Sequence, residues 1–103
     1  MVFIETPTFT RQITSLISDE EYRDLQQMLV INPDAGDLIR GGGGIRKLRW
    51  ARAGSGKSGG IRTIYFWRSA HDQIVMLLAY PKSRKDALTS AETAVLRELV
   101  KEL

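Results

Sequence analysis

The sequence predicts a small α+β domain, with helices packed on one face of a largely antiparallel sheet. Three observations lead to this class. Apolar residues recur at helical spacing in the first third of the chain, three β-rich stretches separated by turn residues follow, and a last helical pattern closes the sequence. The predicted order is β-α-α-β-β-β-α, within one domain that spans residues 1–103.

The N-terminal third predicts one strand and two helices. Residues 2–5 are short, apolar and β-branched, and Pro7 ends this first strand. Apolar residues at helical spacing between 9 and 17 predict a short helix. Ser18 and Glu21 form a capping-box pattern that starts a second helix, and Asn32-Pro33 ends it because proline disfavours helical geometry at the preceding residue.

Beyond residue 45 the pattern changes from helical to extended. Residues 45–52, 61–68 and 74–80 predict three strands, with 69–73 as the turn of a hairpin. The segment 53–60 is rich in Gly and Ser, which is typical of a mobile loop. A second capping box, Thr89 with Glu92, starts a C-terminal helix that is apolar on one side.

Positive charge is concentrated in the middle of the chain. The net charge is only +3, yet eight Lys or Arg residues and no acidic residue lie between Asp37 and Asp72. A surface of one sign with aromatic neighbours is typical of a site for polyanions, and RNA is the first candidate.

Three cations of the predicted strands are candidates for phosphate contacts. Lys47 and Arg49 share one face of their strand because side chains alternate, and Leu48 and Trp50 face the other way. Arg62 follows two glycines, and its planar guanidinium can donate two parallel hydrogen bonds to a phosphate. An ion pair between Arg62 and a helix carboxylate is the alternative.

Lys57 lies in a segment, residues 51–58, that satisfies the looser form of a phosphate-binding loop. Such a loop needs a helix after it, but two glycines and a strand follow here, so we exclude a nucleotide-binding loop. Lys57 is then either a phosphate contact on a mobile loop or a charge that keeps the loop soluble.

Lys82, Arg84 and Lys85 follow the last strand and either extend the basic patch or form a solvated turn. Asp86 is expected to pair with one of them. Most aromatic residues are expected in the core, with Tyr65 and Tyr80 as exceptions whose hydroxyls reach the basic face.

Other classes of site are excluded by composition. The chain has no cysteine, which excludes a disulfide framework, a thiolate zinc site and a cysteine nucleophile. His71 is its one histidine and lies in the predicted hairpin turn, so a two-histidine acid and base pair is impossible. No apolar stretch approaches the ~20 residues of a membrane span. We expect a cytoplasmic protein that uses no metal or cofactor.

Several segments together resemble the HigB branch of the RelE toxin superfamily, over nearly the whole chain. They are Asn32-Pro33-Asp34-Ala35-Gly36-Asp37-Leu38-Ile39, Gly44-Ile45-Arg46-Lys47-Leu48-Arg49, Gly56-Lys57-Ser58-Gly59-Gly60-Ile61-Arg62, Tyr65 and Tyr80-Pro81-Lys82. The resemblance implies that family's compact α+β fold and a ribosome-associated endoribonuclease that cuts mRNA. It also implies neutralisation by a cognate HigA-like, DNA-binding antitoxin.

The resemblance also implies roles for individual residues. Cleavage would proceed without metal, through attack of the RNA 2′-hydroxyl on its own phosphate. The catalytic candidates are Arg62, Lys47, Lys82 and Tyr65, and the RNA-binding candidates are Arg49, Lys57, Arg46, Arg84 and Tyr80. RelE has a tyrosine near the start of its C-terminal helix where Leu88-Thr89 stands here, so the general base stays open.

Two alternatives remain at this point. The first is a non-catalytic RNA- or DNA-binding module that uses the same basic patch. The second is a domain of this fold that has lost activity with the missing tyrosine and acts as an interaction partner.

Overall fold

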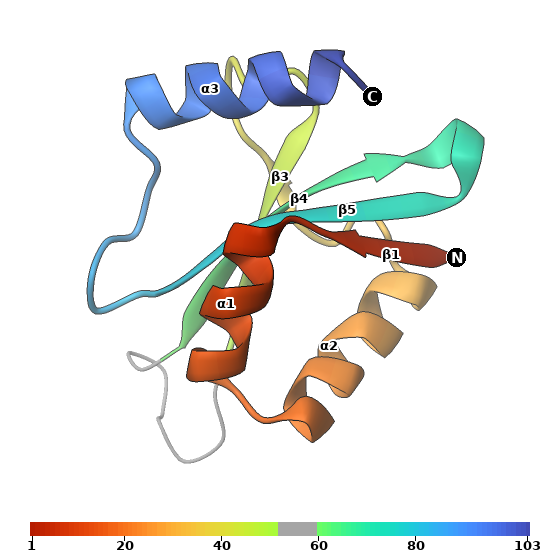
Figure 1. Ribbon diagram of the computed structural model, residues 1–103, viewed down its shortest axis with the longest axis vertical. Helices are drawn as coiled ribbons and strands as arrows, with labels where there is room; N and C mark the ends of the chain where they lie inside the picture. Colours follow the sequence, from red (N-terminus) through yellow and green to blue (C-terminus); the bar gives the residue numbers. More distant parts are fainter. Residues whose placement is uncertain (52–59) are drawn as a thin grey trace.

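A computed structural model describes residues 1–51 and 60–103 of the chain. Strands and helices follow one another in an order close to the predicted one (Figure 1). The elements are β1 (Val2–Glu5), α1 (Pro7–Leu16), α2 (Asp19–Ile31), β2 (Asp37–Leu38), β3 (Ile45–Trp50), β4 (Ile61–Arg68), the short 3₁₀ helix η2 (Ser69–His71), β5 (Gln73–Pro81) and α3 (Ser90–Lys101). The two-residue strand β2 is the element that sequence reasoning missed, because two residues are too few to show a period.

The α+β class and the largely antiparallel sheet are confirmed. The five strands lie in the order β1-β5-β4-β3-β2, and every pair is antiparallel except β1 with β5. The expectation that all helices share one face is wrong, however. Helices α1 and α2 cover one face of the sheet, and α3 packs on the other (Figure 1).

The helices α1, α2 and α3 each start at a side-chain cap that satisfies amides left free in the first turn. The Thr6 hydroxyl accepts from the Phe9 amide before α1. Both predicted capping boxes are present, Ser18 with Glu21 before α2 and Thr89 with Glu92 before α3. The capping-box patterns therefore predicted where α2 and α3 begin, whereas α1 begins at Pro7, two residues before the expected start.

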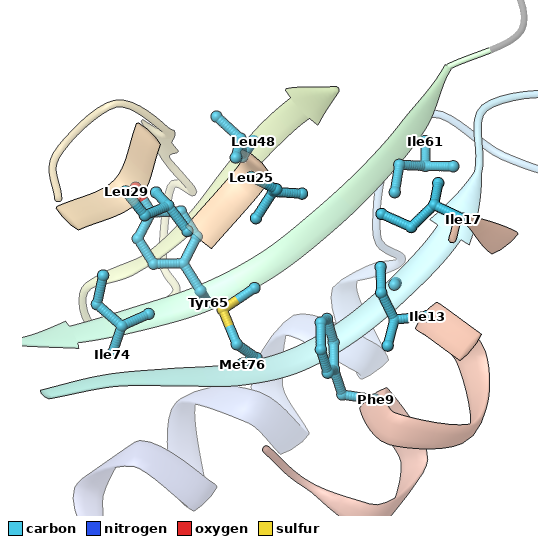
Figure 2. Close-up of a cluster of buried hydrophobic side chains, with 11 residues drawn as sticks. Phe9, Ile13, Ile17, Leu25, Leu29, Leu48, Ile61, Tyr65, Ile74 and Met76 are labelled. Atoms are coloured by element: carbon cyan, nitrogen blue, oxygen red, sulfur yellow. The ribbon is translucent and has the colours of Figure 1, made fainter. Parts of the chain in front are cut away.

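Two hydrophobic clusters hold the helices to the sheet. The larger lies under α1 and α2 and is drawn in Figure 2; it contains Phe9, Ile13, Ile17, Leu25, Leu29, Leu48, Ile61, Tyr65, Ile74, Met76 and Ala79. The smaller lies under α3 and contains Ile45, Ile64, Val75, Leu77, Tyr80, Leu96 and Val100. The sheet is thus buried on both faces, except where α3 leaves the end of β3 and the start of β4 uncovered.

A bulge in β5 supports this double burial. Ile64 pairs with Leu78 and Tyr65 with Met76, so Leu77 is an extra residue in its strand. Leu77 is buried in the α3 cluster, and Leu78 packs against that cluster as well. The bulge therefore supplies two neighbouring apolar side chains to α3.

Candidate nucleic-acid interface

Two predicted cations are aligned across β3 and β4. Arg49 of β3 is the ladder partner of Arg62 of β4, and Arg62 pairs in turn with Tyr80 of β5. Lys47 and Arg49 line one depression together, whereas Leu48 is buried under α1 and α2 and Trp50 packs against the same cluster. The predicted alternation along β3 is confirmed, and it puts Lys47 and Arg49 on the same side of the sheet as α3.

Lys82 joins these arginines at the end of the sheet. A depression of about 390 Å³ is lined by Arg49, Trp50, Ala51, Gly60, Arg62 and Lys82. The Lys82 amide donates to the Gly60 carbonyl at 3.0 Å, which ties the end of β5 to the start of β4. A Cβ on Gly60 would lie 2.7 Å from the Trp50 carbonyl oxygen, so this close approach of two backbones requires glycine.

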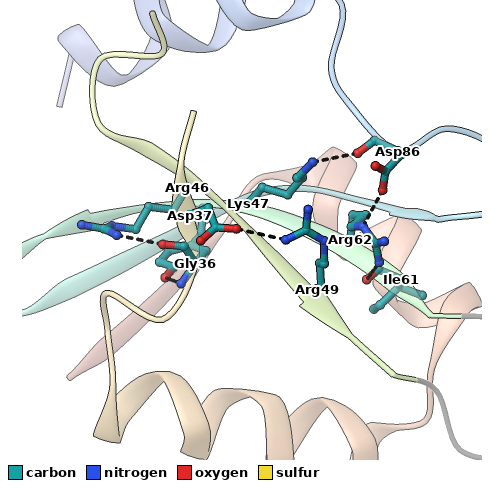
Figure 3. Close-up of polar contacts among 9 residues, drawn as sticks. Gly36, Asp37, Arg46, Lys47, Arg49, Ile61, Arg62 and Asp86 are labelled. Atoms are coloured by element: carbon teal, nitrogen blue, oxygen red, sulfur yellow. Dashed lines mark hydrogen bonds and ion pairs between the residues drawn. The ribbon is translucent and has the colours of Figure 1, made fainter. Parts of the chain in front are cut away.

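Arg62 is almost completely buried, with 6% of its surface exposed. Its Nε lies 3.0 Å from Asp86 Oδ1, and its Nη1 donates to the Ile61 carbonyl at 3.3 Å (Figure 3). A buried guanidinium needs such a partner because desolvating an unpaired charge is costly. The Asp86 side chain is 57% exposed, so this carboxylate lies on the solvent side of Arg62.

The cations around Asp86 hold the pKa of its carboxyl below the ordinary value. The hydrogen bond from Arg62 is the largest cause, and the positive charges of Lys47 and Arg49 act in the same direction against partial burial. Asp86 was expected to pair with Lys82, Arg84 or Lys85, which is wrong. The alternative prediction for Arg62, an ion pair with a helix carboxylate, was right about the ion pair and wrong about its partner. Asp86 lies between β5 and α3 and not on a helix.

Lys47 and Arg49 are also held in place (Figure 3). Lys47 Nζ donates to the Asp86 carbonyl at 3.0 Å, and Arg49 Nη1 lies 3.0 Å from Asp37 Oδ2. Both side chains line a second depression, of about 310 Å³, whose other walls include Asp37 and Leu88. The exposed Arg49–Asp37 pair contributes little to stability, so an incoming anion can exchange for Asp37 at little cost.

Tyr65 and Arg46 lie on the opposite face, so their predicted positions in the basic surface are wrong. Tyr65 is fully buried under α2; its hydroxyl donates to the Pro33 carbonyl at 2.7 Å and accepts from the Gly36 amide at 2.9 Å. Burial raises its pKa. Arg46 donates to the carbonyls of Gly36 and Asp34. Both residues fix the connection between α2 and β2.

Tyr80 is on the predicted side but is 4% exposed, so it cannot stack on a base. Its ring packs in the α3 cluster beneath Lys85, whose Nζ lies 5.0 Å from the ring centroid. Burial raises the Tyr80 pKa, partly offset by Arg62. Within the part of the chain that the structure describes, the Tyr80 hydroxyl has no hydrogen-bond partner.

Two other candidates do not join the cluster. Arg84 lines a small depression beside α1, with Gln12 and Ser15. Lys57 and most of the segment that resembles a phosphate-binding loop lie outside the described residues. Lys85, which was expected either to extend the basic patch or to lie in a solvated turn, pairs with Glu92 at the start of α3.

Sequence reasoning did not identify Asp37 and Asp86 as the partners of Arg49 and Arg62. Each comes from a segment without a clear pattern, and each pairs with an arginine that is distant in sequence. The face on which Arg46 and Tyr65 lie could have been predicted from the sequence. Arg46 alternates with Lys47, and Tyr65 is three residues from Arg62, so strand alternation alone sets both on the other face.

The fold and the site together define the class of this protein. It is a small α+β domain with a cationic surface suited to phosphate groups, formed by Lys47, Arg49, Arg62 and Lys82. Within the described residues no group of three or more potential metal-ligating side chains comes together, and no helix there is long and apolar enough to span a membrane.

The comparison with known families agrees with this class. The family model described as the RelE toxin of the RelE / RelB toxin-antitoxin system matches residues 2–103. The chain therefore belongs to the RelE toxin family. This membership gives it the role of a toxin in a toxin-antitoxin system, with an antitoxin as its partner.

Proposed function

We propose that this toxin is a ribosome-dependent mRNA endoribonuclease of the HigB branch, which stops translation by cutting the message. The observation that supports this most directly is the buried Arg62 guanidinium, which lines one depression with Arg49 and Lys82. Family toxins are generally endoribonucleases. A HigA-like, DNA-binding antitoxin would neutralise the toxin, residues 1–103 would form one toxin domain, and the site of action would be the cytoplasm.

The proposed reaction needs no metal. The RNA 2′-oxygen forms a bond to the adjacent phosphorus and gives up its proton, while the bond from phosphorus to the 5′-oxygen breaks and that oxygen takes up a proton. The products are a 2′,3′-cyclic phosphate and a 5′-hydroxyl. Negative charge concentrates on the phosphorane oxygens, where preorganised cations lower the barrier most.

The geometry suggests separate roles in the reaction for four side chains. Arg62 stabilises the phosphorane because its guanidinium is held rigidly and shielded from water. Arg49 lies beside it in the ladder and holds a flanking phosphate. Lys47 and Lys82 remain the candidates for proton transfer, since Tyr65 is excluded by its position in the core.

In this reaction the substrate phosphate has to displace the Asp86 carboxylate from Arg62. Its carboxylate occupies the Nε edge of Arg62 that a phosphate would use for a bidentate contact. It is largely exposed and lies in a segment without helix or strand, so displacing it disrupts no core packing. In the free protein, Asp86 thus neutralises a buried arginine until a phosphate replaces it.

The test is cleavage of a defined mRNA in a purified translation reaction, with and without ribosomes and with a chelator present. We expect cuts only with ribosomes, unaffected by the chelator, that leave 2′,3′-cyclic phosphate ends. Arg62→Ala should lower the cleavage rate at least a hundredfold. Arg23→Ala is the matched control, because Arg23 is an exposed arginine on α2. An Arg62→Ala protein that cuts as fast as the parent would refute the role of Arg62.

A non-catalytic nucleic-acid-binding module is the second candidate. It is favoured by the lining of the Arg62 depression, which contains neither tyrosine nor histidine among the described residues. Leu88, at the position where RelE has its tyrosine, packs against the α3 cluster instead. Binding of mRNA without any new ends in the same translation reaction would establish this alternative.

A further inference from the structure

A third depression lies between the β2–β3 connection and α3, outside the cluster described above. It has a volume of about 390 Å³ and is lined by Ile39, Arg40, Leu88, Ser90, Thr93 and Arg97, among others. Nothing in the proposed reaction uses these residues.

The polar lining of this depression suits a phosphodiester. Arg40 is exposed, and within the described residues it makes no hydrogen bond or ion pair. Arg97 donates to the Gly41 carbonyl at 3.3 Å, and its contact with Glu98 is long at 4.0 Å. Both guanidinium groups therefore keep donors for an anion, and Ser90 and Thr93 add hydroxyls.

The three depressions form a continuous row. Ile39 and Leu88 line both the Arg40 depression and the Lys47 depression, and Arg49 lines both the Lys47 depression and the Arg62 depression. The Ile39 amide donates to the Ile45 carbonyl, so the Arg40 end of the row lies where β3 begins. Arg49 is four residues further along β3, or about 13 Å at ~3.3 Å per residue.

Charge is distributed unevenly along this row. In the middle, Arg49 and Arg62 are paired with Asp37 and Asp86. At the ends, Lys82 and Arg40 have side chains without an ion-pair partner among the described residues. Lys82 adds its charge to the depression that holds Arg49 and Arg62, so a single phosphate can contact three cations there. A longer strand gains additional contacts at the Arg40 end.

We propose that the Arg40–Arg97 depression is a second phosphate-binding site, which holds the same single RNA strand at a phosphate several nucleotides away from the one at Arg62. This proposal rests on the proposed function, because it assigns both sites to one substrate strand. The ribose and base between them lie over the apolar side chains of Ile39 and Leu88.

The experiment is an NMR titration of the intact protein at low salt with two non-cleavable 2′-O-methyl RNAs, a dinucleotide and a strand of about eight nucleotides. We expect the longer strand to shift the amide signals of Gly41 and Thr93, and the dinucleotide to shift only those near Arg62. Arg40→Ala should weaken binding of the longer strand several-fold and leave the dinucleotide unaffected. It should also reduce the salt slope by about 0.7, the value for one lost contact to single-stranded nucleic acid.

The controls separate this proposal from the proposed function. Arg40→Lys keeps the positive charge and should retain binding of the longer strand. Arg23→Ala removes a positive charge on α2 and should leave binding of both RNAs unchanged. Arg62→Ala should weaken both RNAs. If Arg40→Ala binds the longer strand like the parent while Arg62→Ala weakens both, the second site is refuted and the proposed function stands. If neither RNA shifts any signal of the parent, the second site is refuted, and the cleavage test with ribosomes decides the proposed function separately.

Discussion

At the scale of single residues, Arg62 and Asp86 form the contact with the clearest consequence. A buried guanidinium and a largely exposed carboxylate lie 3.0 Å apart, and the protein holds this pair where a phosphate is proposed to bind. Under the proposed function, Asp86 stabilises the free protein and also competes with the substrate phosphate. These two effects make opposite predictions for stability and for binding.

Replacing Asp86 with Asn should tighten binding of a non-cleavable RNA strand several-fold, because the competing charge is removed while the side-chain size is kept. Fluorescence anisotropy at fixed salt measures this. Asp24→Asn on α2 is the matched control, with the same change of charge on an exposed helix position. Weaker binding by Asp86→Asn would show that Asp86 helps to hold the strand and does not compete with it.

The lowered pKa of Asp86 gives a pH prediction. A carboxyl whose pKa is lower in the folded state stabilises the fold above its unfolded pKa, and this contribution is lost as pH falls through the folded pKa. Carboxyl ¹³C shifts should therefore show the Asp86 carboxyl titrating with a pKa below the ordinary aspartate value of 3.8. Arg62→Gln should bring the Asp86 pKa up toward that value, and Arg23→Gln should leave it unchanged. An Asp86 pKa that does not respond to Arg62→Gln would contradict the assigned cause.

Tyr65 gives the matching prediction for the opposite face. Tyr65→Phe removes one hydroxyl and leaves the Pro33 carbonyl and the Gly36 amide without their partner. We expect the free energy of unfolding to fall by about 1–3 kcal/mol in a denaturant titration. Cleavage per folded molecule should be unchanged. A Tyr65→Phe protein with normal stability and no cleavage would show that Tyr65 takes part in catalysis.

At the scale of elements, the N-cap of α3 connects stability to the site. Thr89 closes the segment that carries Asp86, and its hydroxyl accepts from the Glu92 amide at 3.1 Å. Thr89→Ala should lower the free energy of unfolding by about 1 kcal/mol, and Thr89→Ser should retain most of it. Equal stability of the Ala and Ser variants in the same denaturant titration would mean that the cap does not hold this helix.

Local patterns predicted most of the elements but not how they are arranged. Both capping boxes and the alternation of Lys47 with Leu48 depend on near neighbours in sequence, so they were predictable. The face that α3 covers depends on contacts of Leu96 and Val100 with distant strands, which its helical period does not specify. The partners of Arg49 and Arg62 come from distant segments in the same way, so the pairings with Asp37 and Asp86 were not predicted.

At the scale of the whole molecule, burial on both faces leaves a limited place for function. Helices α1 and α2 cover one face and α3 covers part of the other, so the cations gather where α3 leaves the end of β3 and the start of β4 open. The fold thus holds Arg62 rigidly beside its core while the depression around it stays accessible.

The most direct test is to induce the chain in cells without an antitoxin, as the parent and as Arg62→Ala at equal expression, and to map new 5′ ends across the transcriptome. We predict growth arrest and cuts within translated regions for the parent, and neither for Arg62→Ala. The same arrest and cuts in both proteins, or intact mRNA in both, would contradict an endoribonuclease that depends on Arg62.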